Sequence, residues 1–124
     1  MRFVDDLPSQ YKLIGIDFQG HGRSTLGASP LTYEQYQKDV EAVLTHLNIE
    51  SASILGFSDG GVVGYRMAAK SHIKIERLIA VGAQWRLLPD DPVLPMLAGL
   101  TAGVWSQMFP ESVAYYHEIN PNPN

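Results

Sequence analysis

The sequence predicts an α/β fold with a parallel sheet, and three observations carry this prediction. Apolar runs of strand length occupy residues 11–18, 52–57 and 77–83. Segments with helical signals separate these runs, so strands and helices alternate along the chain. The second run leads through a Gly-x-Ser-x-Gly pentapeptide, residues 56–60, straight into a glycine-rich helix start. Because the runs are mostly apolar instead of alternating, we expect the sheet to be covered on both faces.

Composition and charge exclude several classes of function. The 124 residues are 45% hydrophobic and 18% charged, which is the composition of a globular domain. A net charge of −4 provides no basic surface for nucleic acid or for an anionic membrane. No segment approaches the roughly 20 apolar residues of a membrane span. The absence of cysteine rules out thiolate metal sites and cysteine nucleophiles, and we expect a cytoplasmic location.

The first predicted strand lies between a helical tail and a glycine-rich loop. Residues 1–10 have the pattern of the end of a helix, which Pro8 stops. The strand at 11–18 then leads into the loop Gly-His-Gly-Arg-Ser at residues 20–24. Asp17, just before this loop, is expected to set its conformation and not to contact a substrate.

A well-signalled helix follows. Thr32 and Gln35 have the spacing of a capping box, and Leu31 and Tyr36 sit at the two positions of a hydrophobic staple. Apolar side chains then recur on one face at helical period: Tyr36, Val40, Val43, Leu44 and Leu47.

The turn at Ser58 carries the chemistry. The strand at 52–57, the tight turn and a helix from Gly60 to about residue 72 form the strand–turn–helix context of a nucleophile elbow. So sharp a turn forces the serine into a strained conformation, which we expect Gly56 and Gly60 to make possible. The elbow places the Ser58 hydroxyl over the positive end of the helix, where an oxyanion would be stabilised.

The last part of the chain differs in character. Residues 88–95 are a proline-punctuated link, and helices are predicted at 101–109 and 110–119, the second with proline at its first position. Residues 1–88 are therefore predicted as the core and residues 89–124 as a helical cap segment. Trp85 and Trp105 are candidates for lining a substrate pocket, against ordinary packing as the alternative.

Three blocks, residues 15–24, 56–61 and 77–83, together closely resemble the α/β-hydrolase superfamily. The Ser-Asp-Gly-Gly form of the elbow is similar to that of small esterases and valacyclovir-hydrolase-like members. The resemblance implies a partial α/β-hydrolase fold in which Ser58 is the nucleophile and the backbone N–H of Asp59 is an oxyanion donor. It further implies acyl transfer from a small ester-like substrate, without cofactor or metal, helped by a histidine base and an orienting carboxylate.

The departures from the family pattern are large. In the family the acid and the histidine follow later strands, and the second oxyanion donor follows an earlier one. None of the four histidines here occupies the family's histidine position, so we expect a fragment that is inactive on its own. The family's sheet also has a strand between those at 11–18 and 52–57. Without it, unpaired strand edges would favour self-association.

Two alternatives to a serine esterase stay open. One is a catalytically inactive half-hydrolase that acts as a binding module or is an unstable truncation product. The other is cofactor-free haloperoxidase or C–C hydrolase chemistry on the same serine.

Overall fold

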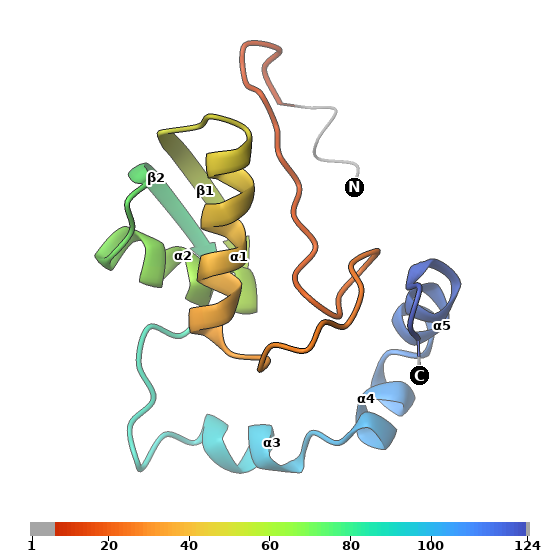
Figure 1. Ribbon diagram of the computed structural model, residues 1–124. Coiled ribbons are helices and arrows are strands. Elements are labelled where there is room, and N and C mark those ends of the chain that lie inside the picture. The colour runs from red at the N-terminus through yellow and green to blue at the C-terminus, as the bar shows by residue number, and fades with distance from the viewer. Residues whose placement is uncertain (1–6, 124) are drawn as a thin grey trace.

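The computed structural model describes residues 7–123, and Figure 1 follows the chain through two strands and five helices. An extended segment without regular structure leads to the first helix. The elements in chain order are α1 (Tyr33–His46), β1 (Ser51–Phe57), α2 (Asp59–Ala69), β2 (Lys74–Val81), α3 (Val93–Gly99), α4 (Ala102–Met108) and α5 (Pro110–Ile119).

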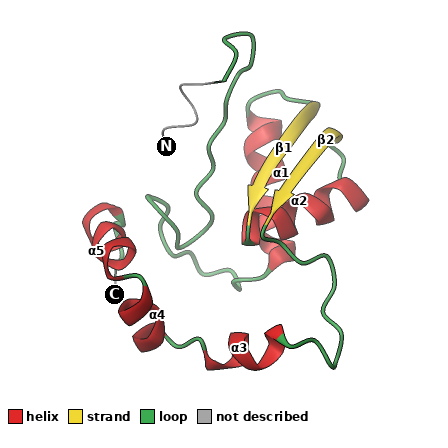
Figure 2. Ribbon diagram, turned by 180° about the vertical axis from the view of Figure 1, so that it is seen from behind, coloured by secondary structure: helices red, strands yellow, loops and turns green. Residues whose placement is uncertain are grey.

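The sheet is a single β-α-β unit. β1 and β2 pair in parallel, from Ser51 opposite Lys74 to Phe57 opposite Val81, with an irregularity after Ala52. The connecting helix α2 packs on both strands, and α1 packs on α2. Figure 1 looks onto α1, whereas Figure 2, from behind, looks onto the strands. Among residues 7–123, the helices therefore cover one face of the sheet and leave the other uncovered, contrary to the cover expected on both faces.

The core lies where α1, α2 and the start of β2 meet. The segments 11–18 and 49–54 contribute half-buried side chains around it. Of the apolar face predicted for α1, Val43 and Leu47 lie at its border, with 36% and 38% of their surface exposed. The buried members are Tyr36, Leu44, Val63, Met67 and Ile73.

The predicted start of α1 is confirmed. Thr32 is the N-cap, and its Oγ1 accepts a hydrogen bond from the Gln35 N–H at 3.1 Å. The Gln35 side chain does not return to the cap as a full capping box requires, because its amide donates to Asp39 at 2.8 Å. Leu31 is more than half exposed, so it does not bury its side chain as a hydrophobic staple requires.

The prediction of a strand at residues 11–18 is wrong. This segment is extended but pairs with neither β1 nor β2, and Figure 1 shows it running apart from them. Ile14 and Phe18 instead pack against the core cluster. A strand needs a backbone partner as well as apolar side chains, and no described strand lies next to this segment. The helical tail predicted at 1–10 falls mostly outside the described residues.

The C-terminal helices confirm two predictions and add a third helix. α4 and α5 correspond to the segments predicted at 101–109 and 110–119. The link predicted at 88–95, however, contains the start of α3, which the prolines concealed. Proline is tolerated in a first helical turn, because the N–H groups there have no acceptor within the helix. Asp91 satisfies one of them, its carboxylate accepting from the Val93 N–H at 3.0 Å.

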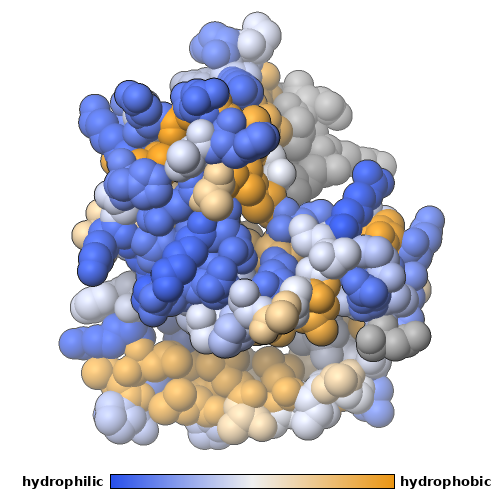
Figure 3. All heavy atoms as spheres, in the orientation of Figure 1, coloured by the Kyte–Doolittle hydropathy of each residue, from blue (hydrophilic) through white to orange (hydrophobic). Residues whose placement is uncertain are grey.

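The exposed surface of α3 is apolar. Figure 3 shows a hydrophobic band at the bottom of the molecule, where Figure 1 places α3. Met96 and Leu97 of this helix are 57% and 42% exposed. None of the helices between residues 7 and 123 has the length and apolar character of a membrane span.

Candidate functional site

Ser58 occupies the sharp junction between β1 and α2. Its φ of 50° and ψ of −118° lie in a region that non-glycine residues rarely adopt, at a cost of about 1–3 kcal/mol. Backbone hydrogen bonds hold it there. The Ser58 N–H donates to the Val81 carbonyl at 2.9 Å, and the Ser58 carbonyl accepts from Gly61 and Val62 at 2.9 and 3.1 Å. This geometry is a sharp strand–turn–helix junction, and its role as a nucleophile elbow stays a prediction.

The glycines around the elbow differ in what they do. A Cβ on Gly56 would meet the carbonyl of Gly60 and lie 2.6 Å from the Gly61 nitrogen. A Cβ on Gly61 would lie 2.5 Å from that of Ala83. At Gly60, nothing lies within 4 Å. The prediction that the tight turn requires a residue without a side chain is therefore confirmed for Gly56. It is wrong for Gly60, which contacts Gly56 through its backbone and has open space where a side chain would lie. The prediction did not include the close packing at Gly61, although the Gly-Gly pair indicated that a second small residue was needed there.

The first turn of α2 presents N–H groups at the elbow. Asp59 and Gly60 are the first two helical residues, so their N–H groups have no acceptor within the helix. They point the positive end of the helix dipole toward the region of Ser58. The arrangement can stabilise negative charge that develops beside the serine.

The Asp59 side chain is tied to α1. Its carboxylate accepts a hydrogen bond from the Tyr33 hydroxyl at 2.8 Å. Burial, this hydrogen bond and the negative charge of Asp59 together raise the pKa of Tyr33 to about 12. The pKa of Tyr36 is also raised, first by burial and then by the charges of Asp59 and Asp39. No pattern in the sequence indicated Tyr33, because it lies 26 positions from its partner.

His21 belongs to an aromatic cluster near this pair. Phe18 stacks on Tyr36 with ring centroids 4.7 Å apart, and His21 meets both rings edge-on at 6.1 and 5.8 Å. The His21 Nδ1 lies 3.1 Å from the Gln19 carbonyl oxygen. These contacts give the imidazole a packing role.

The loop at residues 20–24 is fixed from two sides. The Asp17 carboxylate accepts from the Arg23 N–H at 2.9 Å, as expected of a residue that sets the loop. From the C-terminal segment, the Asn120 side-chain amide donates to the carbonyls of Gly22 and Ser24. Asn120 lay in a run of asparagine and proline that carried no signal for such a role.

The two tryptophans proposed for a pocket lie on separate elements. Trp85 follows β2, is 74% exposed and lies beneath the Arg86 guanidinium at 4.9 Å. Trp105 is on α4, is 46% exposed and packs on Phe109 at 4.6 Å. Their role as substrate contacts stays a prediction.

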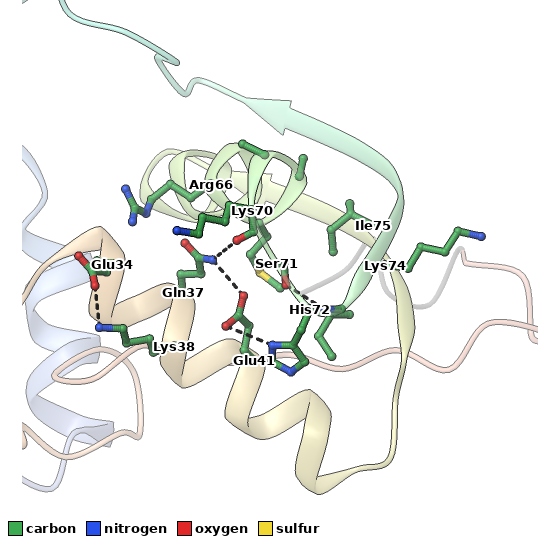
Figure 4. Close-up of a pocket in the computed structure, with 14 residues that line it drawn as sticks. Glu34, Gln37, Lys38, Glu41, Arg66, Lys70, Ser71, His72, Lys74 and Ile75 are labelled. Atoms are coloured by element: carbon green, nitrogen blue, oxygen red, sulfur yellow. Dashed lines mark hydrogen bonds and ion pairs between the residues drawn. The ribbon is translucent and has the colours of Figure 1, made fainter.

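A groove lies at the other end of the strands from Ser58. It has a volume of about 640 Å³ and runs between α1 and the turn from α2 to β2 (Figure 4). Gln37 donates to the Lys70 carbonyl at 2.5 Å and to Glu41 at 2.9 Å, while His72 lies 3.6 Å from Glu41. Thr45 Oγ1 lies 3.0 Å from the second ring nitrogen of His72. The side chains of this groove therefore hold the turn from α2 to β2 against α1, and the groove is remote from Ser58.

Comparison with known proteins supports the family. The family model described as "alpha/beta hydrolase fold" matches residues 1–120. The AB hydrolase superfamily protein YisY of Bacillus subtilis is 33% identical over 64% of this chain and 31% of its own length. The bifunctional esterase/perhydrolase DCH of Acinetobacter calcoaceticus is 27% identical over 94% of this chain and 44% of its own. The 3-oxoadipate enol-lactonase 2 of Acinetobacter baylyi is 39% identical over 48% and 22%.

The chain thus spans less than half of the length of each of these relatives. No solved structure matches it significantly. The match to the family covers nearly the whole chain, and the parallel β-α-β unit agrees with it. This chain belongs to the α/β-hydrolase fold family, whose members named here include an esterase and a lactonase.

Proposed function

We propose that Ser58 is the nucleophile of a serine hydrolase that cleaves small carboxylic esters through an acyl-enzyme. The observation that carries the proposal is the strained backbone of Ser58, held by hydrogen bonds at the end of β1 and the start of α2. Strain of this kind persists only where the surrounding structure enforces it, and it gathers at active sites.

The chemistry proceeds in two steps. The Ser58 oxygen attacks the ester carbonyl while a base takes its proton, and the Asp59 N–H stabilises the oxyanion. The alcohol leaves with that proton, and the acyl group stays on Ser58. Water then attacks the acyl carbon, and the acid product leaves as the serine regains its proton.

The base and its acid partner are proposed to lie outside residues 1–124. Among the described histidines, His21 packs in the aromatic cluster, and His72 lies in the groove between α1 and the turn from α2 to β2. His46 is in the last turn of α1, and His117 is in the last turn of α5. The relatives are more than twice as long as the matched part of this chain. We therefore propose that these 124 residues are part of a larger hydrolase and are inactive alone. The cytoplasmic location also stays a prediction.

The test uses the protein as its own host makes it. Its intact mass is compared with the 13.7 kDa of this chain, and it is then mixed with an excess of a p-nitrophenyl ester. We expect a larger mass and a burst of one nitrophenolate per protein, abolished in Ser58→Ala. Ser51→Ala, an exposed serine at the opposite end of β1, is the matched control and keeps the burst. A burst that survives Ser58→Ala would reject the nucleophile.

A second chemistry on the same serine is supported by a relative named as both esterase and perhydrolase. Hydrogen peroxide would replace water in the second step and release a peracid, and oxidation of a halide by that peracid would complete the cofactor-free haloperoxidase reaction. Peracid formation that depends on both Ser58 and peroxide would establish it. C–C bond hydrolysis stays an alternative of the same class, tested with a β-diketone in place of the ester.

A binding role is the candidate from a different class. The uncovered face of the sheet carries Leu55, Phe57, Ile79 and Val81, which are 47–75% exposed. Parallel strands are ordinarily covered on both faces. If the host makes only the 13.7 kDa chain and no burst occurs, an inactive half-hydrolase that self-associates through this face or its strand edges becomes the conclusion.

A further inference from the structure

We propose that Tyr33 is a positioning residue for acyl transfer: its hydroxyl holds the Asp59 carboxylate toward α1 and disperses the carboxylate's charge. This inference rests on the proposed function, because it concerns the oxyanion that forms beside Ser58. It assigns a role to a residue on a different helix from the nucleophile.

The need for such a residue follows from Asp59 itself. Its backbone N–H is the proposed oxyanion donor, yet the same residue carries a carboxylate within one side chain's length of that N–H. Negative charge so close to a developing oxyanion opposes the reaction, since like charges repel. The carboxylate does suit the first turn of a helix, where the dipole favours an anion. The position therefore stabilises α2 and weakens the site at the same time.

The contacts of Asp59 show how this conflict is reduced. The Tyr33 hydroxyl donates to its Oδ1 at 2.8 Å, which fixes the side chain toward the start of α1. The ion pairs found among the described residues join Lys38 to Glu34, Lys74 to Glu76 and His72 to Glu41, and none includes Asp59. The neutral phenol of Tyr33 is thus the donor that disperses the negative charge of the Asp59 carboxylate.

Tyr33 is itself held in place. It is the first residue of α1, directly after the Thr32 cap, and its ring meets that of Tyr36 edge-on at 6.4 Å. Tyr36 is buried and stacks on Phe18. The hydroxyl is therefore presented to Asp59 by a packed aromatic cluster, and the pair links the N-termini of α1 and α2.

The experiment measures the burst rate of the host-made protein in four variants. They are Tyr33→Phe, Asp59→Asn, the double variant Tyr33→Phe/Asp59→Asn, and Tyr115→Phe as a control that removes an exposed hydroxyl on α5. We expect Tyr33→Phe to slow acylation about tenfold, equivalent to about 1.4 kcal/mol, with KM nearly unchanged. Removing the charge in the double variant should restore the rate to within about twofold of Asp59→Asn, because the two residues act as one unit. Tyr115→Phe should match the wild type.

A second readout does not depend on activity. Ultraviolet titration of the phenols should show one tyrosine with a pKa near 12, absent in Tyr33→Phe and moved toward 10 in Asp59→Asn. The proposal is overturned if Tyr33 has an ordinary pKa, or if the pKa of Tyr33 is the same in Asp59→Asn as in the wild type.

The kinetic outcomes separate this role from the proposed function. A wild-type burst that Tyr33→Phe leaves unchanged rejects the role of Tyr33 alone. A loss that Asp59→Asn does not rescue also rejects it, since Tyr33 would then be needed only for packing. A wild type with no Ser58-dependent burst rejects the proposed hydrolase reaction, and the role of Tyr33 in that reaction falls with it.

Discussion

Asn120 is hydrogen-bonded to Gly22 across 98 positions of sequence. Its side-chain NH₂ donates to the Gly22 carbonyl at 2.9 Å and to the Ser24 carbonyl at 3.1 Å, and its side-chain oxygen Oδ1 accepts from the Asn122 N–H. Only 6% of Asn120 is exposed. Together with the Tyr116 hydroxyl, which donates to the Gly20 carbonyl at 3.2 Å, it attaches the end of α5 to the loop at 20–24 (Figure 1).

Replacing Asn120 by Asp should release this attachment. The carboxylate has nearly the same shape but donates no hydrogen bond, and it brings a negative charge against two carbonyl oxygens. We expect a loss of about 1–3 kcal/mol in the free energy of unfolding, measured with urea, and faster amide exchange in the loop at 20–24. Asn122→Asp is the matched control, because Asn122 contributes its backbone N–H and lies exposed. Equal effects of the two variants would contradict this account of Asn120.

Two adjacent glycines of α2 should respond oppositely to alanine. In Gly61→Ala the new Cβ would lie 2.5 Å from that of Ala83, and relieving this overlap should cost about 1–3 kcal/mol of stability. In Gly60→Ala the Cβ meets nothing within 4 Å, and the higher helix propensity of alanine should be neutral or stabilising by up to about 1 kcal/mol. Urea midpoints of the two variants test this. A destabilised Gly60→Ala with an unchanged Gly61→Ala would reverse the assignment.

Glu41 should make the fold sensitive to acid. Burial works to raise its pKa, but hydrogen bonds from Gln37 and Ser71 and the charge of His72 prevail and hold the pKa below its ordinary value of 4.5. A carboxyl whose pKa is lowered by folding contributes stability that is present above the unfolded pKa. That stability is lost as the pH falls through the lower folded value.

Glu41→Gln should therefore weaken the pH dependence of the unfolding free energy below about pH 4.5. Glu34→Gln is the comparison. Its hydrogen bond to Lys38, and the charge of that lysine, also lower the pKa of Glu34, but the pair is exposed to solvent and screened. We expect no measurable change from Glu34→Gln. If both variants keep the wild-type acid profile, Glu41 does not contribute as argued.

Local signals in the sequence were sufficient where the structure is local. Thr32 placed the start of α1, Gly56 and Ser58 placed the sharp turn between β1 and α2, and Pro110 placed the start of α5. Each of these residues acts on backbone groups within a few positions, so its type carries the information. The same reasoning missed α3, because the prolines of residues 88–95 were interpreted as helix breakers, whereas proline is tolerated in a first helical turn.

The signals failed where the outcome depends on distant partners. The apolar pattern of residues 11–18 correctly indicates that Ile14 and Phe18 face a core, but it does not reveal whether a strand is available for pairing. Asn120 with Gly22 and Tyr33 with Asp59 join residues far apart in sequence. No periodicity encodes such pairs, since they follow from how whole elements pack.

The uncovered face of the sheet leads to the last prediction. Leu55 and Ile79 lie opposite each other in the parallel register and are 56% and 60% exposed, beside the still more exposed Phe57. Contiguous apolar surface of this kind, on a sheet whose outer edges pair with no other described strand, favours association. We expect the 124-residue chain to form dimers or larger species at high concentration, measured by light scattering after size exclusion.

Placing charge on that face should oppose association. In Leu55→Lys/Ile79→Lys two like charges would lie side by side across the strand pair, so a second copy could cover them only by burying both. The double variant should therefore elute as a monomer at concentrations where the wild type associates. Leu13→Lys, an equally exposed leucine away from the sheet, should still associate. A monomeric wild type, or a double variant that associates as strongly, would show that the exposed face is not what brings copies together.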